Sequence, residues 1–136
     1  MPHQFDHEKL NVYHEALAFV GHATELLERV PKRMAVYDQL DRASTAIPLN
    51  IAEGTGKFTP PDRCRYYHTA RGSALECAAC LDVLVVKKIL QKQEITEAKA
   101  ILVRVVSMLV GLIRLSRRTE SMRNQAIMSR GFPKSR

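Results

Sequence analysis

The sequence predicts an all-α fold, an antiparallel up-down bundle of four helices, and three observations lead to that prediction. Apolar residues recur at steps of three and four over long stretches, and no stretch keeps the period of two that is typical of a strand. Turn signals are far apart, with only six Gly and six Pro in 136 residues. The connections between the helical stretches are short, which favours antiparallel neighbours. The length suggests one domain.

The first helix is expected over residues 8–30. One apolar stripe runs from Leu10 to Leu27, and a second stripe, which starts at Val12, lies beside it. A single stripe is enough for one helix seam, so two stripes indicate a wide apolar face or two separate contacts. Pro31 ends this helix, because its ring cannot continue the hydrogen-bond ladder.

The second helix is expected over residues 35–53. Pro48 falls inside it and should bend it, because proline removes one donor and leaves the carbonyl of Ser44 without its helical partner. Gly54 and Gly56 are typical stop signals after a helix.

The third helix should begin at Pro60, a residue that suits the first helical position, with Thr59 as the cap and Asp62 at the positive helix end. We expect it to continue to Leu90. Residues 69–80 are rich in Ala, Gly, Ser, Thr and Cys, which indicates that another helix approaches closely there.

The fourth helix is expected over residues 95–118. Between residues 100 and 115 the polar and glycine positions form one narrow stripe, consisting of Arg104, Ser107, Gly111 and Arg114. A helix at the edge of a monomeric bundle should expose a broader polar face. Burial on nearly all sides therefore predicts a homo-oligomer. The alternative is a helix surrounded by neighbours from its own chain.

Basic residues are concentrated at the C-terminal end of the chain. The net charge is +7, and residues 114–136 contain seven Lys or Arg and one acid, Glu120, whereas residues 1–113 are nearly neutral. We therefore expect a bundle domain over residues 1–118 and a basic, mobile tail over residues 119–136. Such a tail attracts nucleic acid through counterion release, or it merely keeps the protein soluble. The apolar runs are too short and too charged for a membrane span, so we expect a cytoplasmic protein without a membrane partner.

No arrangement of residues points to catalysis, a metal or a cofactor. Cys77 and Cys80 have the C-x-x-C spacing but no second ligand pair, so they are interpreted as buried structural thiols. Residues 54–57, GTGK, lack the first Gly and the final Ser or Thr of a phosphate loop and follow a helix rather than a strand. No Glu has a His three residues later, as a di-iron bundle requires. We expect a protein that is not an enzyme.

Polar residues also occur within two otherwise apolar helical segments, residues 42–56 and residues 70–76. Buried charges must be paired and hydrogen-bonded. We therefore expect a polar network between the second and third helices that fixes their register, or alternatively a ligand-contact site close to the following loop. The candidate residues are Arg42, Asn50, Glu53, Arg71, Ser73 and Glu76.

These two segments, RASTAIPLNIAEG at residues 42–54 and ARGSALE at residues 70–76, together with KLNVY at residues 9–13, carry a family resemblance. The chain resembles the four-helix-bundle proteins encoded by intervening sequences of bacterial 23S rRNA genes, also called S23 ribosomal proteins. The resemblance covers about residues 8–118. It implies a ring-shaped homopentamer, no established enzymatic activity and a poorly defined function. It also implies a fold similar to the accessory protein of diversity-generating retroelements, which binds nucleic acid and a reverse transcriptase.

Two functions follow as expectations. The first is an oligomer that binds structured RNA, or DNA, through basic surfaces and with little sequence specificity, since the chain has no Trp and few other aromatic residues. The candidate nucleic-acid-binding residues are Lys57, Arg63, Arg65, Arg114, Arg117 and Arg118. The second is a scaffold that binds a protein partner and has no direct nucleic-acid role.

Overall fold

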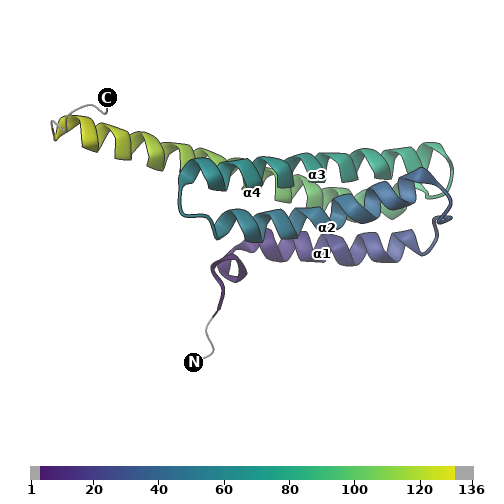
Figure 1. Cartoon of the computed structure of the whole chain (residues 1–136). Coiled ribbons are helices and arrows are strands. Elements are labelled where there is room, and N and C mark those ends of the chain that lie inside the picture. The colour runs from purple at the N-terminus through teal and green to yellow at the C-terminus, as the bar shows by residue number, and fades with distance from the viewer. Residues whose placement is uncertain (1–3, 131–136) are drawn as a thin grey trace.

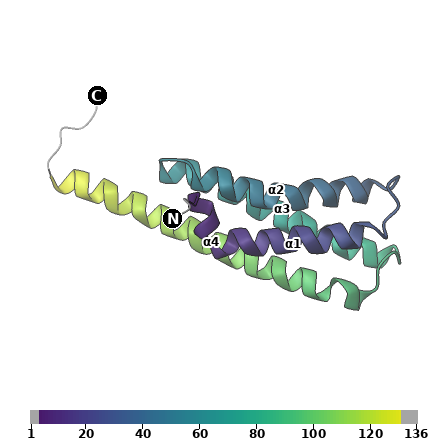
Figure 2. The same cartoon turned by 90° about the horizontal axis from the view of Figure 1, so that it is seen from below.

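The computed structural model describes residues 4–130, and this part of the chain contains four α-helices, one short 3-10 helix and no strand (Figure 1). The elements are η1 (Asp6–Lys9), α1 (Asn11–Leu27), α2 (Ala35–Thr55), α3 (Pro60–Val86) and α4 (Lys92–Ser129). Each helix packs on its neighbours in the sequence, and α4 also packs on α1 (Figures 1 and 2). The predicted antiparallel four-helix bundle is confirmed for the single chain.

One apolar core runs along the bundle axis and receives side chains from all four helices. The residues follow helical spacing, as at Phe19 of α1, Leu40 and Ile47 of α2, Leu81 of α3 and Leu109 of α4, and all five are fully buried. Burying a side chain of this size contributes roughly 1.5–3 kcal/mol relative to leaving it exposed. The core is therefore the main source of stability, and it fixes which face of each helix is turned outward.

Gly54 has a different role from the predicted stop signal. α2 continues past it to Thr55, and a Cβ atom on Gly54 would lie 2.8 Å from the Cβ of Tyr66 and 3.2 Å from the carbonyl oxygen of Arg63. Real Cβ atoms do not approach so closely, so only glycine allows α2 and α3 to meet at this level. The close packing of these two helices sets the position of the loop that joins them.

α3 begins as predicted and ends earlier. The hydroxyl of Thr59 accepts a hydrogen bond from the backbone N–H of Asp62 at 3.4 Å, so the predicted cap is confirmed. The helix ends at Val86 rather than at Leu90, because Lys88 adopts a φ of 62° and the next two backbone N–H groups turn back to the carbonyl of Leu84. This left-handed reversal closes the helix without the glycine that usually marks it.

The other helix ends also differ from the predicted limits. α1 spans Asn11–Leu27 instead of residues 8–30, because η1 precedes it and Leu10 is extended, with φ −92° and ψ 127°. α4 starts at Lys92, where Gln91 and Glu94 form a capping box, and continues to Ser129 instead of ending at Arg118. Residues 119–129 of the expected tail are therefore helical, and residues 131–136 lie outside the described part of the chain.

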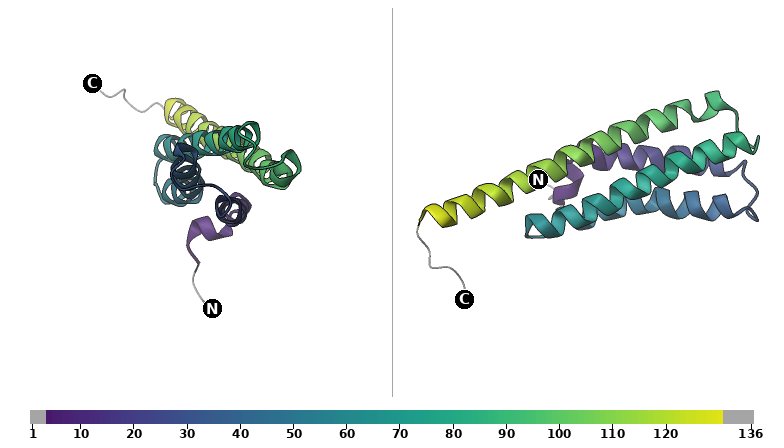
Figure 3. Two further views of the ribbon diagram at one scale, coloured as in Figure 1. Left: turned by 90° about the vertical axis from the view of Figure 1, so that its right-hand side faces the viewer. Right: turned by 90° about the horizontal axis from the view of Figure 1, so that it is seen from above.

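The last turns of α4 project beyond the rest of the bundle (Figures 1 and 3). Residues 121–130 are all exposed. Along the described residues, no helix, α4 included, has the combination of length and apolar character that a membrane span needs.

Within the bundle, α4 is buried on one side only. Its buried residues include Ile101, Val105 and Ile113, whereas Val103 is 66% exposed. Arg104, in the predicted polar stripe, pairs with Glu15 of α1. The single chain thus does not surround α4 with its own helices, which was the alternative to an oligomer, and it leaves an apolar residue in water.

The expected polar network between α2 and α3 is not formed within the chain. No hydrogen bond or ion pair joins any two of the six candidate residues, all of which the structure describes. The physical reason is their orientation. Arg42, Glu53 and Glu76 are exposed to water, and the half-buried Asn50 donates to the carbonyl of Ala46 in its own helix at 2.8 Å. Helix register is instead fixed by apolar packing and by the close approach at Gly54.

The other two candidates of that network are half-buried on α3. Arg71 has a buried Nε atom without a hydrogen-bond partner, and Ser73 forms no side-chain hydrogen bond within the described chain. Neither residue supplies the link between helices that the sequence suggested.

Candidate nucleic-acid interface

The basic residues singled out in the sequence meet at one end of the bundle. The α2–α3 loop lies at this end, and α4 passes it and projects further (Figures 1 and 2). Because α3 and α4 are antiparallel, the first turns of α3 lie beside the later turns of α4. Two contacts show this, from the Sγ of Cys64 to the carbonyl oxygen of Ile113 at 3.7 Å and from Arg117 to the Nε2 of His68 at 3.3 Å. We call the α2–α3 loop, the first two turns of α3 and residues 114–130 of α4 the basic end.

The loop side of the basic end combines cations with aromatic rings. The Nζ atom of Lys57 lies 5.1 Å from the centroid of the Tyr66 ring, and the guanidinium carbon of Arg65 lies 5.8 Å from it. Arg63 donates a hydrogen bond to the carbonyl of Phe58 at 3.2 Å. Arg65 also pairs with Asp62 at 3.3 Å, an exposed pair that contributes little to stability. The three predicted residues of this side therefore lie within one small region.

The α4 side presents a row of arginines. Arg114, Arg117 and Arg118 are exposed, as a nucleic-acid contact requires. Two further exposed arginines, Arg123 and Arg130, follow on the projecting turns and face roughly the opposite side of the helix from Arg114, so the arginine row is a series along the helix rather than a line on one face. The helix was predicted to end at residue 118, so these two arginines were not expected on an ordered surface. The absence of Gly and Pro between residues 112 and 130 is the signal that α4 continues.

The surface between the two sides is hollowed. A hollow of about 260 Å³ lies between the start of α3 and α4, and a second one of about 320 Å³ opens between α3, α4 and η1. Arginines line both, Arg117 the first and Arg63 the second. Glu120, the one acid of residues 114–130, lines the first hollow, and one of its carboxylate oxygens is buried without a hydrogen-bond partner in the described chain.

Cys77 and Cys80 are buried thiols that favour the protonated, unreactive form. Cys77 is fully buried and Cys80 almost so, which confirms that they are buried thiols. Burial raises the pKa of Cys77 to about 12, with smaller contributions from Cys80 and Glu76, and burial likewise raises the pKa of Cys80. Metal binding and redox exchange need a thiolate, which both sites disfavour at neutral pH. Among residues 4–130 there is also no gathering of three His, Cys, Asp or Glu that could hold a metal ion.

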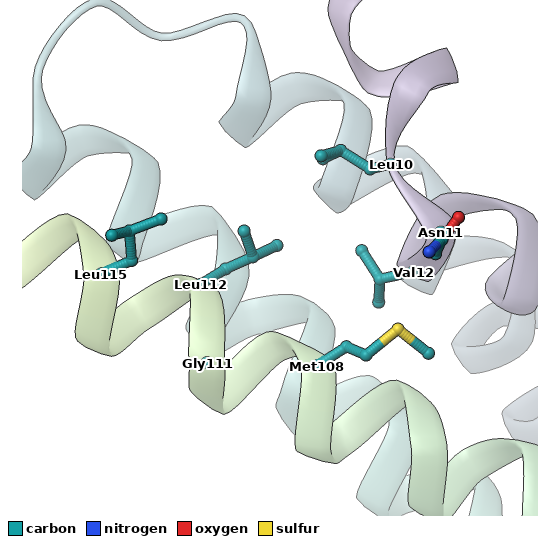
Figure 4. A pocket seen from close by; sticks show the side chains of 7 residues that line it. All are labelled: Leu10, Asn11, Val12, Met108, Gly111, Leu112 and Leu115. Carbon is teal, nitrogen blue, oxygen red and sulfur yellow. The ribbon is translucent and has the colours of Figure 1, made fainter.

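An apolar groove lies next to the basic end, between the start of α1 and α4 (Figure 4). It has a volume of about 270 Å³ and no charged side chain in its lining, which consists of Leu10, Asn11, Val12, Met108, Gly111, Leu112 and Leu115. Its chemistry suits an apolar side chain rather than a phosphate.

The fold and this surface define a class, a four-helix-bundle protein with a cluster of cations at one end. The chain belongs to the 23S rRNA-intervening sequence protein family, whose model matches residues 8–111. The match stops before Arg114, so the arginine row lies beyond it. No curated protein matches the chain.

A solved structure has the same fold. It is a protein of unknown function from the S23 ribosomal protein family of Bacteroides thetaiotaomicron, with a TM-score of 0.70 and 19% sequence identity. The similarity covers 97% of that protein and 75% of this chain. Family and fold are therefore established, and a part of this chain has no counterpart in that structure.

Proposed function

We propose that this protein is a non-enzymatic, homo-oligomeric protein that binds structured RNA through the basic end. The observation that supports this most is the meeting of two separate cationic segments, the α2–α3 loop and the arginine row of α4, at the same end of the molecule. Arginine forks suit phosphate oxygens, and phosphate contacts supply most of the affinity of sequence-independent binding. DNA offers the same phosphates, so the preference for RNA is part of the proposal.

The oligomer is supported by the outer side of α3 and α4. A hollow of about 210 Å³ lies there between apolar side chains that include Leu75, Val103 and Val106, and Leu75 is 48% exposed. Val83 and Val86 of α3 are exposed as well. We call these residues the apolar outer face and propose that a second copy of the chain covers it. A ring of five copies, which the family resemblance suggests, would present the basic end five times.

A protein-interaction scaffold is the second candidate, and the groove in Figure 4 favours it because it is apolar and open. In that case the basic end would be incidental. Capture from nuclease-treated extract that returns one protein in stoichiometric amount, with no affinity of the pure protein for RNA, would support the scaffold.

The test of RNA binding is a salt titration with a purified RNA hairpin and a pair of matched variants. The double variant Arg118→Gln and Arg123→Gln removes two exposed charges from the arginine row. The control, Lys32→Gln and Arg33→Gln, removes two exposed charges from the α1–α2 connection at the opposite end. Both variants change the net charge equally and leave the core untouched.

We expect wild-type affinity to fall steeply as salt rises. The arginine variant should bind more weakly, and the slope of its log affinity against log salt should be smaller by about 1.5, since each lost phosphate contact removes roughly 0.7–0.9. The control should follow the wild type. No binding by the wild type at low salt, or an equal loss in both variants, would contradict the proposal.

A further inference from the structure

Phe58, in the α2–α3 loop, is an unusual aromatic residue. It is 97% exposed, more than any other large apolar residue in the described chain. It has no place in the core, because the loop turns it outward between Gly56 and Thr59. A solitary exposed apolar residue is ordinary on a protein surface, so exposure alone assigns no role to Phe58. The residues around it indicate one.

The loop that carries Phe58 is held at both ends. The backbone N–H of Lys57 donates to the carbonyl of Gly54 at 3.1 Å, and Thr59 caps α3. Arg63 holds the carbonyl of Phe58 itself from the first turn of α3. A loop whose backbone is already fixed loses little backbone freedom when a ligand covers it, which is the advantage of a preorganised site.

Cations lie next to Phe58 in the sequence and close to its backbone in space. Lys57 precedes it, Arg63 contacts its carbonyl, and Tyr66 lies between Lys57 and Arg65. A flat apolar ring on a loop that also carries cations matches an unpaired nucleotide, which has a π-face to stack and a phosphate on either side. A membrane surface would require a wider apolar face beside the basic residues, and Phe58 stands alone.

From this arrangement we infer that Phe58 is a stacking platform for an unpaired RNA base, with Lys57 and Arg63 on the adjacent phosphates. The inference rests on the proposed function and deepens it, because it names the part of a structured RNA that the loop recognises. The arginine row contacts the backbone of any helix, whereas Phe58 favours an RNA with an exposed base, in a loop or a bulge. The protein would thus distinguish RNA structures without reading a sequence.

The test compares two RNA probes of equal phosphate number, a hairpin with an unpaired loop and a blunt duplex. Phe58→Ala should lower affinity for the hairpin by about 5- to 150-fold, the range that corresponds to the loss of one base–aromatic stack. Duplex affinity should change by less than about twofold, and the salt slope for both probes should stay the same, since no phosphate contact is lost. Phe58→Tyr should keep the hairpin affinity. Phe5→Ala, which removes another exposed ring, is the matched control and should behave as the wild type.

A second measurement reports the stack directly. The chain has no Trp, so Phe58→Trp places a single indole at the site. We expect its fluorescence to be quenched by the hairpin and not by the duplex. As an exposed loop position, residue 58 can be replaced without disturbing the core.

The outcomes separate this inference from the proposed function. If the wild type binds the hairpin and Phe58→Ala binds it equally well, the stacking role of Phe58 is wrong and the proposal of RNA binding is unaffected. An equal loss in Phe58→Ala and Phe5→Ala would also overturn it. If the wild type binds neither probe at low salt, both the proposed RNA binding and the stacking role of Phe58 are wrong. If Phe58→Ala loses binding to vesicles of anionic phospholipid and keeps its RNA affinity, the ring serves a membrane surface instead.

Discussion

α4 consists of two regions that share a helical backbone and differ in everything else. From Ile95 to Ile113, every third or fourth side chain is buried against α1 and α3. From Arg117 to Glu120 the contacts with α3 are few, as between Arg117 and His68, and from residue 121 onward every side chain is exposed. A helix shorter than about 12–15 residues is marginal in water on its own, but here the bundle supplies the nucleus and the last turns only propagate it.

Stability and the proposed recognition are therefore divided along one helix. The first region stabilises the bundle through apolar burial and carries hardly any net charge that could attract RNA. The second region carries positive charge and buries hardly any surface. Substitutions in the second region should therefore change binding without changing the fold, and substitutions in the first should do the reverse.

The largest expected effect lies in the buried region. Leu109 is fully buried, so Leu109→Ala should lower the free energy of unfolding by about 2–5 kcal/mol through lost burial and the cavity it leaves. Met122→Ala, in the projecting region, should change it by no more than about 0.5 kcal/mol. Urea denaturation followed by circular dichroism measures both. Equal losses would show that the projecting turns pack on something, and the division of α4 would be wrong.

The next effect concerns the outward side of the first region. Val103→Glu places a charge on the apolar outer face and should convert the proposed oligomer to a smaller species, because an unpaired charge in a protein contact is costly. Leu49→Glu, on α2, has a similar exposure, 63% against 66%, and lies away from the apolar outer face, so it should keep the oligomer. Light scattering at several concentrations measures the mass.

A wild-type protein that is monomeric in that experiment would overturn the oligomer and leave Val103 as an ordinary exposed residue. The arginine variants described above would still test RNA binding, because the basic end of each chain is complete in itself.

The sequence predicted what local chemistry decides. The bundle, the start of α3 at Thr59 and Pro60, and the buried thiols all followed from spacing and capping. The end of α3 did not, because the reversal at Lys88 depends on hydrogen bonds back to Leu84 and carries no glycine to announce it.

The site was predictable in its residue types and less so in its arrangement. The six basic candidates could be chosen from charge, but their meeting at one end required the antiparallel packing of α3 on α4. The expected network around Arg42 and Glu53 was wrong because spacing within a helix does not say whether a polar side chain turns toward its neighbour or toward water. Phe58 was overlooked because a single aromatic residue in a loop has no periodicity to mark it.

The buried thiols of the bundle should give the free energy of unfolding a small dependence on pH. The pKa of Cys77 is about 12 in the folded chain, against an ordinary value of 9.0. The unfolded chain therefore loses this proton first as pH rises, and the stability that depends on it is fully present below pH 9 and decreases toward pH 12. Between pH 8 and pH 10 the loss of the Cys77 proton in the unfolded chain should lower the free energy of unfolding by about 1 kcal/mol. The free energy of unfolding of the wild type should fall more steeply over this interval than that of Cys77→Ala, although the variant starts from a lower value. Other groups that titrate there are common to both proteins, so the difference in slope isolates Cys77. Parallel curves would mean that the thiol does not hold its proton more firmly in the fold than in the unfolded chain, and that the core around it admits water.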